Sequence, residues 1–524
     1  MRFVLGLLII FARLTVCYKF LAFSPQFAMS HVNFLAKIAD TLVDAGHEVV
    51  ILAPRVNPSI KGALAKKARV IELPENEFTK RWSAGEERLM DLYWNASMIT
   101  LAMEGSEVMQ NILRAANGTL HYPGLIDQLR AEKFDAAFTE NPLGFGIFHM
   151  AGIDKTAIAS SFTNFESSYS LTQMPSNPAY VPSIFSAYGD RMSFWQRVKN
   201  KFMSVGYGLL MTSILGRMEP LVEQFTPGVT LLDMASANSL VLLNSEPLLD
   251  YPRPTVHRVV EIGGVTTATD VEALSQYWSD ILARRNRSVI LSFGTYVRAS
   301  VMPEVYKETI RNALAKFPDV TFIWKYEIPE HNVSQGISNI VETTWMPQVA
   351  LLNDPRLTAF ITHGGQGSTL EAVYAGTPML MVPTQGDQFR NAAMIKRAGL
   401  GEIVQLSELE DTGRLEAAVA DLLENEQYAS NARKMSAMLR DRPFSAKEKL
   451  VRNMEFLAAH GPLRMLDHEG RNLNFAQYYL IDVVLFIVIV TILVLCSIGL
   501  ACFASCRFCY WKVRRCTYES LKKE

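Results

Sequence analysis

Cysteine is missing from the long middle of this sequence. The 524 residues include six cysteines, and none of them lies between Cys17 and Cys496. That part of the chain therefore has no structural disulfide and no thiol nucleophile. Metal-binding patterns are also lacking, because the sequence has no Asp-x-Asp pair and no spaced cluster of His and Cys. We therefore expect neither a metal nor a bound cofactor.

An excess of charge of either sign is lacking as well. The chain has 51 Lys and Arg against 52 Asp and Glu, which gives a formal net charge of −1. No basic stretch interleaved with aromatic residues occurs outside the tail, so a nucleic-acid partner is not expected. A secreted hydrolase is poorly supported, since there is no Gly-x-Ser-x-Gly elbow and no clear carboxylate pair. The length is too great for one core and predicts two domains with additional segments.

The amino-terminal end is typical of a secretory signal peptide. An apolar run over residues 3–12 follows a basic start, and Thr15 and Cys17 are small residues ahead of a possible cut before Tyr18. An uncleaved anchor is the alternative, but the run is too short to span a bilayer. Residues 1–17 are therefore predicted to be a signal peptide.

A second apolar segment lies near the carboxyl end. Residues 483–506 carry no charge and are long enough to cross a bilayer as a helix, with a buried core helix as the alternative. Six Lys and Arg against two Glu follow in 507–524, so this tail is predicted to be cytosolic and the bulk of the chain lumenal. The end of the tail matches a dilysine retrieval signal only partly, because Leu521 takes the place of one lysine. The predicted arrangement is a single-pass type I membrane protein.

Four Asn-x-Ser/Thr sequons fit a lumenal chain. Short motifs of this kind also occur by chance, so we expect that about two of them carry glycans. The candidate acceptors are Asn95, Asn117, Asn286 and Asn332.

The first domain is predicted to open with a strand, a helix and a second strand. Residues 19–24 and 48–53 are short apolar runs, and the helix between them is predicted to have Ser30 as its N-cap and to end at Gly46. This order of elements implies a parallel sheet. His31 then lies in the first helical turn, just past the first strand, where open α/β sheets bind ligands. A solvated surface histidine would fit the same position.

A histidine that acts as a base needs a partner that holds its tautomer and stabilises the imidazolium. Residues 134–140 are predicted to form another strand, with Glu140 at its carboxyl end. Asp135 is a weaker candidate, because it lies at the opposite end of the same strand. Glu140 is therefore the predicted partner.

Residues 345–391 carry the densest signals in the chain. A buried strand is predicted over 358–362 and ends on His363, a turn follows at Gly364-Gly365, and a helix begins at about Ser368. Such a turn presents backbone N–H groups and a positive helix end to an anion. Many α/β folds use a glycine turn only to reverse the chain, so its neighbours decide the interpretation.

Those neighbours offer a partner for each part of a nucleotide sugar. Trp345 has a face that can stack on a base, and the amide of Gln348 can bind the edge of the base. The carboxylate of Glu371 can accept from ribose hydroxyls. Asp387 and Gln388 suit the hydroxyls of a sugar. The predicted diphosphate-binding residues, at two glycine turns and one helix start, are Gly294, Thr295, His363, Gly365, Gly367 and Ser368.

The pattern W-x-x-Q, HGG, a Glu eight residues after the His, and GDQ resembles the signature of the UDP-glycosyltransferases. The segment and the ends of the chain are most similar to the membrane-anchored UDP-glucuronosyltransferases of animals, over essentially the whole chain. One departure is Gly367, where many members carry Asn. The backbone amide remains there, but a side-chain contact to phosphate is lost.

The resemblance implies an α/β fold of GT-B type, with two doubly wound Rossmann-like domains, a cleft between them and a C-terminal transmembrane helix. It assigns the general base to the His that stands fifteen residues before a Gly-His-Glu, which here is His31. The family has Asp as its partner, whereas Glu140 is one methylene longer. The implied segments are 1–17 (signal peptide), 18–270 (acceptor domain), 271–445 (UDP-sugar domain), 446–482 (returning helix and stalk), 483–506 (membrane helix) and 507–524 (cytosolic tail).

The resemblance further implies inverting transfer of a sugar, with glucuronic acid as first choice, from a UDP-sugar to a hydroxyl of a small lipophilic acceptor. The expected location is the endoplasmic reticulum membrane, and detoxification is the expected role. The alternatives are a lipid or xenobiotic transferase that uses UDP-glucose or UDP-galactose, and a non-catalytic UDP-sugar-binding membrane protein. The sequence leaves the acceptor open, and a homo-oligomer is compatible with it. Residues 194–218, which mix basic and apolar side chains, could form an amphipathic helix on the membrane.

Overall fold

A computed structural model describes residues 16–60, 65–75, 79, 92–94, 118–163, 172–267 and 271–522. The chain forms two compact units, one ending at Leu466 and the other beginning at Asp467. Asn95, Asn117 and residues 1–15 of the predicted signal peptide lie outside the described residues.

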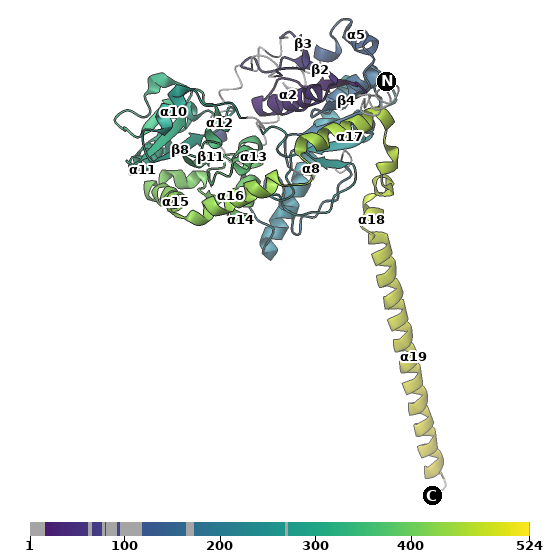
Figure 1. Cartoon of the computed structure of the whole chain (residues 1–524). Coiled ribbons are helices and arrows are strands. Elements are labelled where there is room, and N and C mark those ends of the chain that lie inside the picture. Colours follow the sequence, from purple (N-terminus) through teal and green to yellow (C-terminus); the bar gives the residue numbers. More distant parts are fainter. Residues whose placement is uncertain are drawn as a thin grey trace, which may run out of the picture. The chain divides into compact units, whose positions relative to one another are not determined.

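The first lobe of the first unit is built on a seven-stranded parallel sheet (Figure 1). The strand order is β3-β2-β1-β4-β5-β6-β7. The chain adds strands to one side from β1 to β3 and to the other side from β4 to β7, so the order reverses between β1 and β4. Ligands of open α/β sheets bind where such a reversal occurs, at the carboxyl ends of the strands. The strands are β1 (Lys19–Phe23), β2 (Glu48–Pro54), β3 (Arg69–Leu73), β4 (Ala136–Thr139), β5 (Thr156–Ser160), β6 (Leu240–Leu243) and β7 (Val259–Glu261).

The second lobe repeats this plan with six parallel strands in the order β10-β9-β8-β11-β12-β13. The order in which the chain adds strands reverses between β8 and β11, so the loops after these two strands meet at a second switch point. Central strands such as β9 and β11 are buried almost throughout, as parallel strands covered on both faces must be. The strands are β8 (Arg287–Ser292), β9 (Val320–Lys325), β10 (Ile340–Thr343), β11 (Leu357–Thr362), β12 (Met379–Met381) and β13 (Gly401–Ile403).

Helices cover both sheets. Those of the first lobe are α2 (Met29–Asp44), α5 (Leu125–Ala131), α6 (Leu143–Met150), α8 (Phe194–Glu223) and α9 (Leu231–Ser236). Those of the second lobe are α10 (Gln276–Leu282), α11 (Glu304–Leu314), α12 (Gln348–Leu352), α13 (Gln366–Ala375), α14 (Gln388–Arg397), α15 (Thr412–Glu424) and α16 (Glu426–Arg440).

The helix α17 (Ala446–His460) brings the chain back from the second lobe to the first. Its residues Leu450, Met454 and Leu457 are buried in the same core cluster as apolar residues of α2 and β1. The ammonium of Lys155 also donates a hydrogen bond of 2.6 Å to the carbonyl of Ala458. Because this helix belongs to the core of the first lobe, it ties both ends of the unit together.

The predicted N-cap of α2, Ser30, lies two residues after the observed N-cap, Ala28. The helix begins at Met29, with extended backbone at Ala28 (φ −143°, ψ 132°) and no side-chain cap, so Ser30 lies inside the first turn rather than at the N-cap. The predicted stop at Gly46 is confirmed, since its φ of +92° is one that residues with a Cβ rarely adopt. His31 is consequently the third residue of the helix.

The helix predicted over 194–218 extends through α8 to Glu223. Trp195, Phe202 and Leu209 recur at intervals of seven residues, and all three side chains are exposed. Asn200 and Ser204 are buried on the opposite side. Contact with a membrane remains a prediction for this helix.

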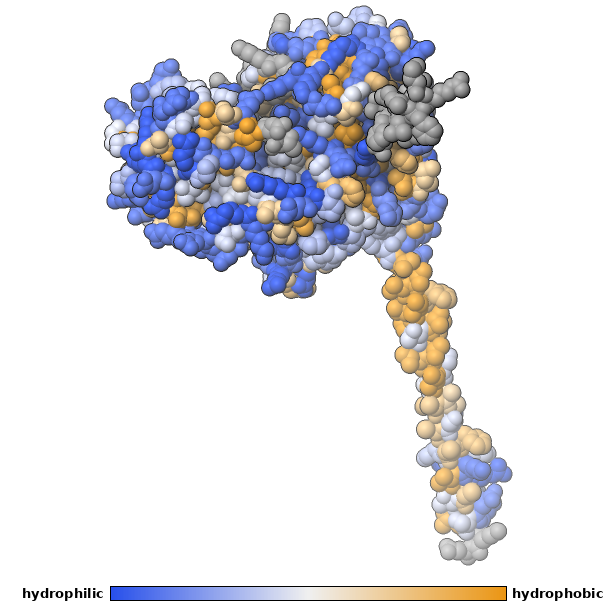
Figure 2. Space-filling model, in the orientation of Figure 1, coloured by the Kyte–Doolittle hydropathy of each residue, from blue (hydrophilic) through white to orange (hydrophobic). Residues whose placement is uncertain are grey.

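The second unit contains α18 (Phe475–Tyr478) and α19 (Ile481–Leu521), which has 41 residues. Within the part of the chain that the structure describes, α19 is the one helix long and apolar enough to cross a membrane, by length and composition. Figure 2 shows it as hydrophobic over most of its length and hydrophilic near its carboxyl end. The predicted span, 483–506, lies inside it.

Candidate active site

His31 and Glu140 meet at the switch point of the first sheet. His31 follows β1 at the start of α2, and Glu140 is the first residue after β4. Atom Nδ1 of His31 lies 2.7 Å from Oε2 of Glu140, and the two side chains are 16% and 8% exposed. The longer arm of Glu therefore reaches the histidine. Asp135 lies at the other end of β4, where its carboxylate accepts a hydrogen bond of 2.7 Å from the backbone N–H of Lys19.

Ser161, which follows β5, completes this group. Its backbone N–H and its hydroxyl donate to Oε1 of Glu140 at 2.6 and 2.7 Å. The same hydroxyl lies 3.0 Å from Nδ1 of His31. The rings of Phe27 and Phe162 pack on the imidazole at centroid distances of 4.7 and 5.2 Å. These contacts fix the position of the ring.

The charges of this group are coupled. Burial lowers the pKa of His31, but the charge and hydrogen bond of Glu140, with the more remote charge of Asp387, outweigh burial and raise it above its ordinary value. Burial raises the pKa of Glu140, but the charge and hydrogen bond of His31 and the Ser161 donors bring it below its ordinary value. Glu140 is therefore a carboxylate at neutral pH.

His363 occupies the corresponding place at the switch point of the second sheet. A Cβ added to Gly294 would lie 2.7 Å from its Cε1, and one added to Gly365 would lie 2.7 Å from its Nε2. The two predicted glycine turns thus hold one imidazole between them, which no larger residue would allow. Burial, with the charge of Lys325, lowers the pKa of His363 to about 4, against a hydrogen bond to the backbone of Ser292. The ring is therefore neutral, and its single N–H is used in that bond.

The helix α13 starts at this turn. It begins at Gln366, two residues before the predicted start, with Gly365 as its N-cap. Among the described residues, no atom lies within 4 Å of a Cβ placed on Gly367, so there is open space for a side chain there. The first backbone N–H groups of this helix have no partner inside it and can bind an anion.

Gln348, Ser368 and Glu371 form one cluster. Gln348 is the first residue of α12, and its amide donates to Oγ of Ser368 at 3.0 Å and to Oε2 of Glu371 at 2.7 Å. Burial raises the pKa of Glu371 to about 7, against the hydrogen bond from Gln348 and the charge of Lys37 in α2. Trp345 beside this cluster is 68% exposed, which leaves its indole accessible.

Asp387 and Gln388 stand at the start of α14. Three donors of the preceding loop, at Thr384 and Gln385, converge on Oε1 of Gln388 and hold its side chain. Burial raises the pKa of Asp387 to about 6, against a hydrogen bond from Asn391 and the charge of His31. The charge of Asp387 also raises the pKa of His31, so the start of α14 lies within electrostatic range of the first switch point.

Ser161 and Asn391 belong to the site but were not predicted from the sequence. The amide of Asn391 bridges the carbonyl of Gly364, at 3.0 Å, and Oδ2 of Asp387, at 2.9 Å, while its buried Oδ1 has no hydrogen-bond partner among the described residues. Its position three residues after Gln388, on one helical face, was the available signal. Ser161 carried no local signal. In the described residues, no group of three or more His, Cys, Asp or Glu could hold a metal ion.

Comparison with known proteins agrees with the family resemblance of the sequence motifs. A family model described as "UDP-glucoronosyl and UDP-glucosyl transferase" matches residues 19–517. The chain is 28% identical to UDP-glucuronosyltransferase 1A5 of Rattus norvegicus over 491 residues, 92% of this chain and 91% of the relative. It is 28% identical to UDP-glucuronosyltransferase 1A1 of Mus musculus over 507 residues, 92% of this chain and 90% of the relative.

Solved structures agree on the fold. Os79 from O. sativa, in complex with U2F and trichothecene, aligns with a TM-score of 0.57 at 18% identity, over 84% of this chain and all (100%) of that chain. Phytolacca americana UGT2, complexed with UDP-2fluoro-glucose and pterostilbene, aligns with a TM-score of 0.54 at 15% identity, over 85% of this chain and 100% of that chain. With the two doubly wound sheets, these neighbours confirm the predicted GT-B architecture.

Proposed function

Because the chain belongs to the family of UDP-glucuronosyl and UDP-glucosyl transferases and is a UDP-glycosyltransferase, we propose that it moves glucuronic acid from UDP-glucuronic acid to a hydroxyl of a small lipophilic acceptor. The names of the mammalian relatives support the choice of sugar. The observation that carries catalysis is the His31–Glu140 contact of 2.7 Å, in a site whose charges extend to Asp387 in the second lobe. An intact base and partner favour an enzyme over a non-catalytic UDP-sugar binder.

In the proposed reaction His31 acts as the general base. Glu140 accepts the Nδ1–H, which leaves the lone pair of Nε2 for the acceptor. As the acceptor O–H bond breaks, its proton passes to Nε2 and its oxygen bonds to the anomeric carbon from the face opposite UDP, so the configuration inverts. The bond from that carbon to the diphosphate oxygen breaks, and UDP leaves with the electron pair. Glu140 then balances the imidazolium.

The second lobe would hold the donor. The amides at Gly365, Gly367 and Ser368, with the dipole of α13, would bind the diphosphate and take up the negative charge that grows on it. The neutral ring of His363 would lie beside the diphosphate, and the turn at Gly294-Thr295 would contribute further amides.

The remaining partners would fix the ends of the donor. Trp345 would stack on the uracil, and Gln348 would bind its edge. Glu371 would accept from the ribose hydroxyls. Asp387 and Gln388 would bind the transferred sugar, and the unpartnered Oδ1 of Asn391 is a further acceptor near Asp387. Holding donor and acceptor in line supplies an effect worth up to about 7–11 kcal/mol.

Product analysis tests this proposal. Membranes that carry the protein are given a mixture of UDP-glucuronic acid, UDP-glucose and UDP-galactose, with several phenols and steroids, and products are identified by mass spectrometry. We expect glucuronides, and none from His31→Ala membranes. Hexosides in place of glucuronides would move the assignment to UDP-glucose or UDP-galactose, and an absence of any conjugate would contradict transfer.

We also propose that α19 anchors the protein in the endoplasmic reticulum membrane with both lobes in the lumen. Asn286 and Asn332 are exposed on the second lobe, where a lumenal glycan could be added. A mobility shift on glycosidase treatment that is lost in the Asn286→Gln/Asn332→Gln protein would support this orientation. Cleavage of the lobes by protease in sealed microsomes would contradict it.

A further inference from the structure

The segment Ser161-Phe162-Thr163 holds the base and is itself held by the second lobe. Ser161 donates to Glu140, and Phe162 packs on the imidazole of His31. Thr163, one residue further, faces α14 of the second lobe through a hydrogen bond to Arg390. Any shift of this segment would therefore move the groups that position the base.

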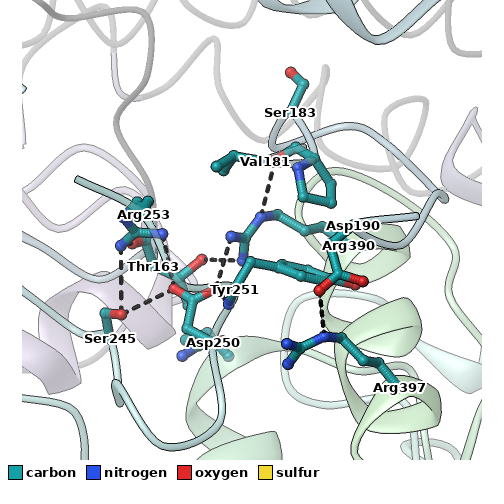
Figure 3. Close-up of polar contacts among 12 residues, drawn as sticks. Thr163, Val181, Ser183, Asp190, Ser245, Asp250, Tyr251, Arg253, Arg390 and Arg397 are labelled. Atoms are coloured by element: carbon teal, nitrogen blue, oxygen red, sulfur yellow. Dashed lines mark hydrogen bonds and ion pairs between the residues drawn. The ribbon is translucent and has the colours of Figure 1, made fainter. Parts of the chain in front are cut away.

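Arg390 is a fully buried residue of α14 in the second lobe, and its guanidinium points toward Thr163, Asp250 and Tyr251 (Figure 3). Its guanidinium is 0% exposed and pairs with Oδ1 of Asp250 at 2.6 Å. It also donates to Oγ1 of Thr163 at 2.9 Å and to the carbonyl of Pro182 at 3.2 Å. The plane of the group lies over the ring of Tyr251, 4.9 Å from its centroid. Asp250, Thr163 and Pro182 belong to the first lobe, whereas the ring of Tyr251 is buried in the core cluster of the second lobe.

Arg390 and Asp250 form a buried, charged ion pair. Burial raises the pKa of Asp250, but the charges of Arg390 and Arg253 outweigh burial and bring it below its ordinary value. Arg253 also donates a hydrogen bond of 2.7 Å to the carbonyl of Thr163, so Thr163 is bound at both its side chain and its backbone. A buried arginine whose donors all point into the other lobe is satisfied only when the lobes hold this arrangement.

A second connection runs beside the first. The side-chain amide of Gln366, at the start of α13, donates a hydrogen bond of 2.8 Å to the carbonyl of Asn244 in the first lobe. The side-chain amide of Asn244 in turn donates a hydrogen bond of 3.1 Å to the carbonyl of Ser161. Both helices whose amino ends face the proposed donor site thus reach the segment that carries Ser161.

We propose that Arg390 is a positioning residue, through which the donor-binding lobe holds Thr163 and thereby keeps Ser161, Glu140 and His31 in the geometry for transfer. Arg390 lies between Gln388 and Asn391 in α14, so ordering of the amino end of this helix by a bound sugar also orders its guanidinium. This inference rests on the proposed function, because it needs His31 to be the base.

The test uses the full-length protein in membranes. Arg390→Lys keeps the charge but lacks the planar fork that bonds Asp250 and Thr163 together. We expect kcat to fall about 10- to 100-fold, since a misplacement of 1 Å can cost about 100-fold. The Kd of UDP and the KM of the UDP-sugar should stay within about twofold, because uniform donor binding is not removed. The acid limb of the pH profile of kcat/KM should move to lower pH as the His31–Glu140 contact loosens.

Arg397→Lys is the matched control. Arg397 lies on the same helix and also pairs across the lobes, with Asp190 at 2.7 Å. It shares the ring of Tyr251 with Arg390, but among the described residues it has no hydrogen bond or ion pair with the segment 161–163. This variant should keep kcat and the pH profile. Thr163→Val removes the hydroxyl without leaving a buried carboxylate unpaired, and it should reproduce the loss of kcat even if Arg390→Lys fails to fold. Thr163→Ser should restore it.

The outcomes separate the two proposals. A wild-type protein that transfers sugar, beside Arg390→Lys and Thr163→Val proteins with normal kcat and pH profile, would overturn the positioning role alone. A rise of the UDP Kd in proportion to the loss of rate would also overturn it, by making Arg390 a donor-binding residue. A wild-type protein without turnover would overturn the proposed function, and the positioning role with it.

Discussion

Glu140 bonds His31 with 2.7 Å between Oε2 and Nδ1, although its side chain is one methylene longer than the aspartate that the family pattern led us to expect. Ser161 explains how the longer side chain is kept in place, because its N–H and hydroxyl bind the other carboxylate oxygen. The additional methylene is thus accommodated by a donor pair, and the histidine keeps an oriented, ionised partner.

Glu140→Gln should lower kcat by about 100-fold or more, within the range that general-base catalysis contributes. The charge of Glu140 is what raises the pKa of His31 against burial. Its removal lowers that pKa, so the acid limb of kcat/KM should shift to lower pH. Asp135→Asn, at the far end of β4, should leave the limb in place. An unchanged limb in Glu140→Gln would contradict the pairing.

Glu371 should make donor binding depend on pH near neutrality. Burial raises its pKa to about 7, and the ionised form is the better acceptor for ribose hydroxyls. The affinity for a non-hydrolysable UDP-sugar, whose diphosphate does not titrate in this range, should therefore rise as the pH increases through 7. Calorimetry on Glu371→Gln should give a flat profile, and the same slope in both proteins would remove Glu371 from the donor site.

Much of this site follows from sequence because its main residues lie just past the carboxyl ends of strands or in the first turn of the helix that follows. Short apolar runs place β1, β4, β8 and β11, and parallel pairing then brings His31, Glu140, Gly294 and His363 to strand ends. The contacts that hold the site together are different in kind. Arg390 and Asp250 are 140 residues apart, and Ser161 and Glu140 are 21 apart on different strands, so no local pattern announces them. The start of α2 was misplaced because extended backbone at Ala28 began the helix before the better capping residue, Ser30.

Gly367→Asn should bind UDP more tightly, by about 10- to 150-fold, the equivalent of the 1.5–3 kcal/mol that one hydrogen bond to a charged group contributes. Open space surrounds its Cβ position, so the side chain can enter without a clash. Gly365→Ala is the control at a crowded position two residues away, since its Cβ would lie 2.7 Å from Nε2 of His363. That variant should bind UDP more weakly. Looser binding by Gly367→Asn would show that the space does not face the diphosphate.

Trp345→Ala should weaken UDP binding by about 5- to 150-fold, the equivalent of the 1–3 kcal/mol that stacking on one base contributes. Because this side chain is 68% exposed, the melting temperature should change little. Trp345→Phe should retain part of the affinity. Equal UDP affinity in wild type and Trp345→Ala would place the base elsewhere.

The most direct test of the whole account is paired measurement of UDP affinity and sugar transfer for His31→Ala beside the wild type. The account predicts an unchanged Kd for UDP and a loss of transfer of about 1,000-fold, within the range for removal of a general base. A variant that binds UDP and transfers sugar at the wild-type rate would contradict it.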